Sequence, residues 1–125
     1  MSGGFDAISG PVAALCGFHE HRANHMHLRD SKILGTVQIP ILDPDAKAAY
    51  PAHYCKQNGI DPIDAATIGD GSNDLAMLQA AGMGVAFEEK PLLMAKVAIQ
   101  LNHTDLRGLL YLQGYEQRDF IADKI

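Results

Sequence analysis

Cysteine and long apolar runs are both scarce in this 125-residue chain, and each scarcity excludes a class of protein. The two cysteines, Cys16 and Cys55, do not have the spacing of a metal site, and reduced thiols in a cytoplasmic protein fit them best. No apolar run approaches the roughly 20 residues that a membrane-spanning helix requires. The first five residues have neither the basic segment nor the apolar core of an export signal. We therefore expect a cytoplasmic protein that does not enter a membrane.

Positive charge is also scarce. Ten lysines and arginines against fifteen aspartates and glutamates give a net charge of −5, and the basic residues form no stripe, so a nucleic acid is not an expected partner. What the chain does contain is typical of a globular protein, because 47% of its residues are apolar and 20% are charged. Its length suits one domain rather than two.

The order of apolar and polar segments predicts an α/β fold. Residues 23–41 have the pattern of a β-hairpin. Pro51 is expected to kink the second helix or to delay its regular part. Because strands and helices alternate, we expect a parallel sheet covered on both faces. Helices are predicted over 5–17, 43–58, 75–81, 91–98 and 106–112, and strands over 65–68, 83–87 and 99–101.

The hexapeptide Gly69-Asp70-Gly71-Ser72-Asn73-Asp74 is the most informative segment. It follows the predicted strand over 65–68, and ligands of open α/β sheets bind at the carboxyl ends of strands. Two carboxylates provide the oxygen ligands that Mg²⁺ takes in proteins. The flanking glycines are expected to let the backbone turn sharply and approach a ligand closely. The alternative is an ordinary turn between a strand and a helix.

Four segments, in this order, resemble the haloacid dehalogenase phosphohydrolase superfamily, and within it the phosphoserine phosphatases. Ser2-Gly3-Gly4-Phe5 is similar to the second motif, in which a Ser or Thr binds the phosphoryl group. Lys47 resembles the lysine of the third motif, and the hexapeptide 69–74 resembles the acidic fourth motif. Residues 102–115 look like the tail of the bacterial enzymes. The resemblance spans essentially the whole chain.

The resemblance implies a fold, a reaction and a role for each motif residue. The fold is an incomplete three-layer, Rossmann-like parallel sheet with a β-hairpin, and residues 1–125 are the carboxyl-terminal portion of the catalytic domain. The reaction is Mg²⁺-dependent hydrolysis of a phosphomonoester, phosphoserine by resemblance, through an aspartyl-phosphate. The implied roles are catalysis for Lys47 and Asp74, phosphate binding for Ser2, Gly3, Gly4, Lys47 and Asn73, and metal binding for Asp70 and Asp74.

The first motif of the family has no counterpart in the sequence. That motif is Asp-x-Asp followed by Ser or Thr, and it supplies the nucleophile; the helical cap that recognises serine is missing too. Asp43-Pro44-Asp45 imitates it superficially, but Ser or Thr does not follow. We expect Asp43 or Asp45 to cap the helix that carries Lys47 instead. The chain is thus expected to be inactive without an added nucleophile segment. The alternatives are a non-catalytic Mg²⁺- and phosphate-binding module or a truncated gene product.

The missing motif also has a structural consequence. In the superfamily the nucleophile strand lies beside the fourth-motif strand, so residues 65–68 are expected to present an unpaired edge. Exposed edges recruit other strands. We expect this edge to pair with a complementing amino-terminal polypeptide or with a second copy. The alternatives are that the hairpin closes the edge or that the isolated chain is poorly soluble.

A transition-metal site is a further alternative for the histidines of residues 19–27. His25 and His27 fall on one face of the predicted strand, and imidazole suits such metals. The family pattern requires no such site, so we expect these side chains to face solvent on the hairpin.

Overall fold

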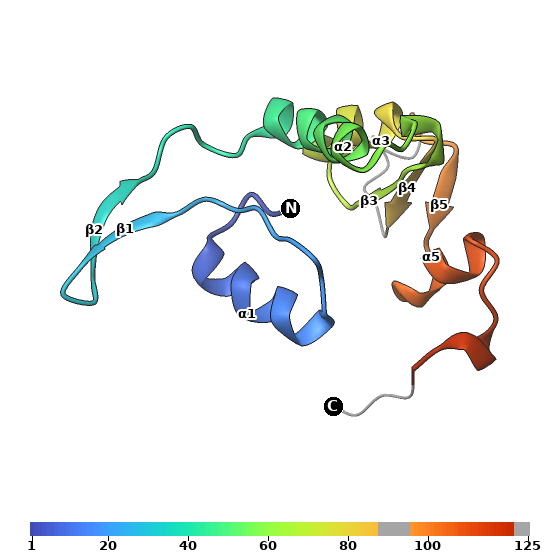
Figure 1. The fold of residues 1–125 in the computed structure, drawn as a ribbon, viewed down its shortest axis with the longest axis horizontal. Helices are drawn as coiled ribbons and strands as arrows, with labels where there is room; N and C mark the ends of the chain where they lie inside the picture. The colour runs from blue at the N-terminus through green and yellow to red at the C-terminus, as the bar shows by residue number, and fades with distance from the viewer. Residues whose placement is uncertain (88–95, 122–125) are drawn as a thin grey trace.

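The computed structural model describes residues 1–87 and 96–121, and these residues form two separate sheets (Figure 1). Strands β1 (Met26–Arg29) and β2 (Lys32–Val37) make an antiparallel hairpin. Strands β3 (Ala66–Gly69), β4 (Met83–Phe87) and β5 (Ile99–Leu101) make a parallel sheet in that order. The α/β fold with a parallel sheet and a hairpin is therefore confirmed.

Four helices accompany the sheets in the described part of the chain. They are α1 (Asp6–Cys16), α2 (Pro44–Asn58), α3 (Leu75–Ala80) and α5 (Arg107–Leu112). Helix α3 contacts β3 and β4, and α2 lies against α3 (Figure 1). The helix predicted over 91–98 falls mainly outside the described residues. None of the helices within 1–87 and 96–121 is long and apolar enough to cross a bilayer.

Helix α2 begins and ends at residues whose chemistry suits the ends of a helix. The Asp43 carboxylate accepts a hydrogen bond from the Ala46 N–H at 2.9 Å, so the predicted cap is confirmed. The cap explains why Asp43-Pro44-Asp45 looks like a nucleophile motif. Gly59 ends the helix at φ 66°, in the left-handed region that favours glycine. The expectation that Pro51 delays the helix is wrong, because the cap and Pro44 at the first position start the helix well before it.

The apolar core lies between α3 and the parallel sheet. Val85 and Ala86 of β4 are fully buried, and Met77 and Leu78 of α3 pack against Ala86. Gly84 permits this packing, since a Cβ there would lie 1.9 Å from the Leu78 carbonyl oxygen. A side chain at that position would push α3 away from the sheet.

The amino-terminal region, residues 1–42, has little core of its own. Its first residues run parallel to residues 22–24, with the Asn24 N–H donating to the Gly4 carbonyl at 2.9 Å. Helix α1 leaves Ile8 71% and Leu15 79% exposed. In Figure 1 the hairpin and α1, drawn in blue, stand to one side of the parallel sheet.

Strand β3 is at the edge of the parallel sheet. It pairs with β4 on one side, from Ala66 opposite Met83 to Gly69 opposite Ala86, and no described strand pairs with its other side. The hairpin does not close this edge, because β1 and β2 bond to each other in a separate sheet. That alternative was wrong. The unpaired edge itself is present in the described sheet.

Candidate active site

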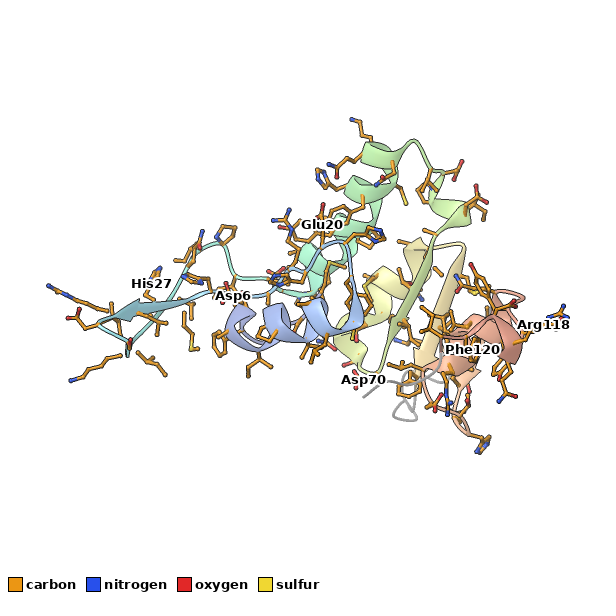
Figure 2. The ribbon with its side chains drawn as sticks, turned by 60° about the horizontal axis from the view of Figure 1, so that its bottom comes forward. Asp6, Glu20, His27, Asp70, Arg118 and Phe120 are labelled. Carbon is orange, nitrogen blue, oxygen red and sulfur yellow. The ribbon has the colours of Figure 1, made fainter. Side chains whose placement is uncertain are left out.

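A cleft of about 1200 Å³ lies between the amino-terminal segment and the open edge of β3. Figure 2 labels Asp70 in the loop that follows β3, at the carboxyl end of that strand. Apolar side chains such as Met77 and Leu106 line other parts of the wall. The cleft brings together five of the residues that the sequence singled out, namely Ser2, Gly3, Lys47, Asp70 and Asp74.

Gly4 and Asn73 are not on the wall of this cleft. The Gly4 N–H donates to Ser2 Oγ at 3.0 Å and so supports the loop that carries the hydroxyl. Asn73 lies within the turn after Asp70, where its Oδ1 fills the space beside Gly71. Phosphate binding by these two residues stays a prediction.

Lys47 and Asp74 form a buried ion pair at the cleft. Lys47 Nζ donates to Asp74 Oδ1 at 3.0 Å, and the two side chains are only 10% and 7% exposed. Such charges are tolerated in a protein interior when they are paired and hydrogen-bonded. An ammonium has three donors, so one bond to Asp74 leaves two for a ligand. This geometry favours Asp74 as the group that orients Lys47.

Gly69 and Gly71 make room for side chains of the same turn. A Cβ on Gly69 would lie 2.6 Å from Asp74 Oδ2, and a Cβ on Gly71 would lie 2.5 Å from Asn73 Oδ1. Gly71 has a φ of −136°, which any residue adopts. The structure therefore gives a different reason for these glycines than the sharp turn we expected. Gly69 leaves space for the Asp74 carboxylate that holds Lys47, and Gly71 leaves space for the Asn73 amide.

Asp70 is the residue best placed to hold a metal ion. Its exposed carboxylate faces the cleft and has no hydrogen-bond or ion-pair partner among the described residues. Mg²⁺ commonly uses one or two carboxylates and completes its shell with water and phosphate oxygens. Asp70 fits that pattern, whereas Asp74 is already engaged by Lys47 and by the Gly71 N–H. Within 1–87 and 96–121, no three His, Cys, Asp or Glu side chains gather into a metal cluster.

The histidines of the hairpin region are exposed, as expected, and have protein partners. His25 Nδ1 lies 2.8 Å from Asp6 Oδ2, and His27 Nδ1 lies 2.9 Å from Thr36 Oγ1. Figure 2 shows His27 on the hairpin, well away from Asp70. His25 and His27 therefore do not contribute to the cleft, whereas His19 lies on its wall.

Sequence reasoning missed the residues that join the two walls of the cleft. Arg22 Nε donates to the Tyr54 hydroxyl at 2.9 Å, and the guanidinium lies 5.3 Å from the centre of the Tyr50 ring. Burial raises the pKa of Tyr54, although the Arg22 hydrogen bond opposes this. The contact ties the amino-terminal region to α2. An isolated arginine and a distant tyrosine form no motif, so nothing in the sequence marks them.

Comparison with known proteins adds the family to this geometry. Residues 43–109, which include Lys47 and the acidic turn, match the haloacid dehalogenase-like hydrolases. The chain belongs to this family. Among curated members, the chain is 37% identical to the phosphoserine phosphatase of Haemophilus influenzae over 94% of the length of this chain. The chain is 34% identical to the phosphoserine phosphatase of Methanocaldococcus jannaschii over 88% of the length of this chain. The resemblance of this haloacid dehalogenase-like chain to phosphoserine phosphatases is thereby confirmed.

A solved structure agrees with these relatives. It is described as the phospho-aspartyl intermediate analogue of phosphoserine phosphatase, and it superimposes with a TM-score of 0.81 at 34% identity over 89% of this chain and 53% of that one. The chain spans 37% of the Haemophilus protein and 52% of the Methanocaldococcus protein. The part of these relatives that the chain matches includes Lys47 and the acidic turn.

Proposed function

We propose that residues 1–125 form the phosphate- and metal-binding part of a phosphoserine phosphatase, which hydrolyses O-phosphoserine to serine and phosphate with Mg²⁺. The observation that carries this proposal is the buried Lys47–Asp74 pair, which faces the same cleft as Ser2, Gly3 and Asp70. A point charge, a hydroxyl and a free carboxylate around one cleft suit a phosphoryl group and its cation. The names of the curated relatives support phosphoserine as the substrate.

Each wall residue has a distinct task in this proposal. Phosphoryl transfer depends mainly on positioning and charge neutralisation. Lys47 directs its two remaining donors at the phosphoryl oxygens, and Asp74 fixes the ammonium. The Ser2 hydroxyl, which accepts a hydrogen bond from the Gly4 N–H, donates its own hydrogen to a phosphoryl oxygen. Asp70 is the residue that would hold Mg²⁺, and the ion would neutralise negative charge on the phosphoryl group.

The attacking carboxylate comes, in this proposal, from a polypeptide outside residues 1–125. Asp70 and Asp74 are assigned to the metal and to Lys47, and Asp43 caps α2. The incoming carboxylate attacks phosphorus, and the serine oxygen leaves with a proton from the second aspartate of the same Asp-x-Asp motif. Water, deprotonated by that aspartate, then hydrolyses the acyl-phosphate to phosphate and the free carboxylate. The chain is therefore inactive alone.

We propose the open edge of β3 as the place where that polypeptide docks. The Ala65 carbonyl accepts from the Met83 N–H. Along a strand of a parallel pair, every second residue bonds to the neighbouring strand. Because Ala65 bonds to β4, Ala66 and Ile68 direct their backbone N–H and C=O groups the other way, at the cleft. An added strand would satisfy those groups and place its carboxyl end near Asp70. A second copy of the chain is the competing occupant of this edge.

We also propose that the protein works in the cytoplasm. Cys16 is exposed, Cys55 is buried, and both are free thiols. Free thiols persist in reducing compartments. Fractionation of the source cells, followed by immunodetection, tests this assignment.

The decisive experiment mixes the chain with a polypeptide that carries the Asp-x-Asp-Ser/Thr motif and measures phosphate release from O-phosphoserine. The folded mixture should turn over only with Mg²⁺. A complement whose first motif aspartate is changed to asparagine is the matched control and should give no release. A folded stoichiometric complex without activity would contradict the proposal. Calorimetry would then show whether the chain is instead a module that binds Mg²⁺ and phosphate.

A further inference from the structure

Asn24 is a buried polar residue that lies behind the cleft rather than on its wall. It is 8% exposed, and its backbone bonds to the first residues of the chain on both sides. Its N–H donates to the Gly4 carbonyl at 2.9 Å, and its carbonyl accepts from the Asp6 N–H at 2.8 Å. Neither the motifs nor the proposed mechanism uses this residue.

The Asn24 side chain joins two segments that are far apart in sequence. Its Nδ2 donates to the Gly3 carbonyl at 3.0 Å, and its Oδ1 accepts from the Leu42 N–H at 2.6 Å. Gly3 belongs to the proposed phosphate loop. Leu42 directly precedes Asp43, the residue that caps α2 and so begins the helix of Lys47. One amide therefore bonds to the loop and to the residue that precedes the cap of the Lys47 helix.

The Asn24 side-chain bonds matter for the position of the Ser2–Gly3 loop, because few other contacts hold that loop. Asn24 and Ala13 are the only buried residues among 1–42, so apolar packing does little to place the phosphate loop. The other polar link, Arg22 to Tyr54, is exposed to solvent. An amide is suited to the task because it offers a donor and an acceptor at once. Aspartate would keep an acceptor for Leu42 and lose the donor to Gly3.

We propose that Asn24 is a positioning residue that sets the distance between the Ser2–Gly3 loop and Lys47 across the cleft. The inference rests on the proposed function, in which both groups bind one phosphoryl group. Asn24 does not touch the substrate. Its removal changes where the loop lies relative to α2, and phosphate affinity falls as a consequence.

The first measurement reports the separation of α1, which directly follows the Ser2–Gly3 loop, from α2, which carries Lys47. It does not depend on phosphate binding. Spin labels are attached to the native Cys16, exposed at the end of α1, and to a cysteine introduced by Lys56→Cys at an exposed position on α2. Electron–electron resonance should give a narrow distance distribution for the parent protein. In Asn24→Asp the distribution should broaden and its mean should shift. Asn24→Ala, which buries no charge, is the second variant should Asn24→Asp fail to fold.

The second measurement is calorimetry with inorganic phosphate and Mg²⁺ on the same chain. Asn24→Asp should weaken phosphate binding about tenfold, a usual size for coupling between linked groups. Leu101→Ala is the matched control, because Leu101 is a buried core residue that does not line the cleft. This control should lower stability and leave phosphate affinity unchanged.

The outcomes separate the two proposals. An unchanged distance distribution in folded Asn24 variants overturns the positioning role, whatever the phosphate affinity. Equal losses of affinity in Leu101→Ala and Asn24→Asp also overturn it, because the effect would then follow stability alone. A parent protein that shows the expected distance but binds no phosphate overturns the proposed function and leaves the positioning result standing.

Discussion

The region of residues 43–121 and the amino-terminal region, residues 1–42, differ in what holds them together. All of the buried apolar residues in the described chain except Ala13 belong to 43–121. Residues 1–42 instead expose Ile8, Leu15 and Ile33 by 66–79%. The Arg22–Tyr54 hydrogen bond joins them to α2, and Asn24 bonds within them, to Gly3 and to Leu42. The candidate site lies where the two regions meet. Lys47 and Asp74 are buried in the region that has the apolar core, whereas the Ser2–Gly3 loop is held mainly by polar contacts.

The largest effect should come from Lys47→Ala, which leaves Asp74 buried without its partner. Removing one member of a buried pair costs about 3–5 kcal/mol, and we expect urea unfolding to show a loss of that size. Lys56→Ala, on the exposed face of the same helix, should change stability by less than about 0.5 kcal/mol.

The double variant Lys47→Met/Asp74→Leu sharpens this result. Replacing a buried ion pair by apolar residues of similar volume is often neutral. The double variant should therefore recover most of the lost stability while binding no phosphate. If Lys47→Ala unfolds at the same urea concentration as the parent, the pair is not buried in solution.

The next effect compares leucines from the two regions. Leu78 is 3% exposed in the core, and Leu15 is 79% exposed on α1. Leu78→Ala should lower the free energy of unfolding by about 2–5 kcal/mol, and Leu15→Ala should change it by less than about 0.5 kcal/mol. Chemical denaturation measures both. A large loss in Leu15→Ala would mean that another surface covers α1 in solution, and the contrast between the regions would then fail.

Gly84 and Gly10 test the same contrast, between the tightly packed core and the loosely packed amino-terminal region, by adding one methyl group to each region. Gly84→Ala places a methyl group 1.9 Å from the Leu78 carbonyl oxygen, and overpacking of this kind typically costs about 1–3 kcal/mol. Gly10→Ala in α1 makes only ordinary contacts, at 3.5 Å from His21. It should raise stability by up to about 1 kcal/mol, because alanine favours a helix interior over glycine. Thermal unfolding followed by circular dichroism measures both variants, and a stabilised Gly84→Ala would show that α3 does not pack this tightly.

The same division describes how much the sequence could predict. The strands over 83–87 and 99–101 and both ends of α2 follow from local chemistry, namely apolar runs, an aspartate cap and a closing glycine. The Lys47–Asp74 contact follows from the family motifs. The Asn24 link does not, because a single asparagine bonding to Gly3 and Leu42 has no periodicity and no motif. Contacts between segments distant in sequence become visible only once the chain is folded.

The smallest effect should come from Tyr54→Phe, which removes the hydroxyl that accepts from Arg22 at 2.9 Å. An exposed polar contact contributes little, so we expect the melting temperature to fall by no more than about 3 °C. The phenol has a folded pKa above its usual value, mainly because it is partly buried. Its contribution is therefore complete below the unfolded pKa of about 10 and is lost as the pH rises through the folded value. The difference in melting temperature between parent and Tyr54→Phe should hold from pH 7 to about pH 9 and shrink above the unfolded pKa. A difference that is absent at pH 7 would show that the Arg22–Tyr54 hydrogen bond does not hold the two regions together.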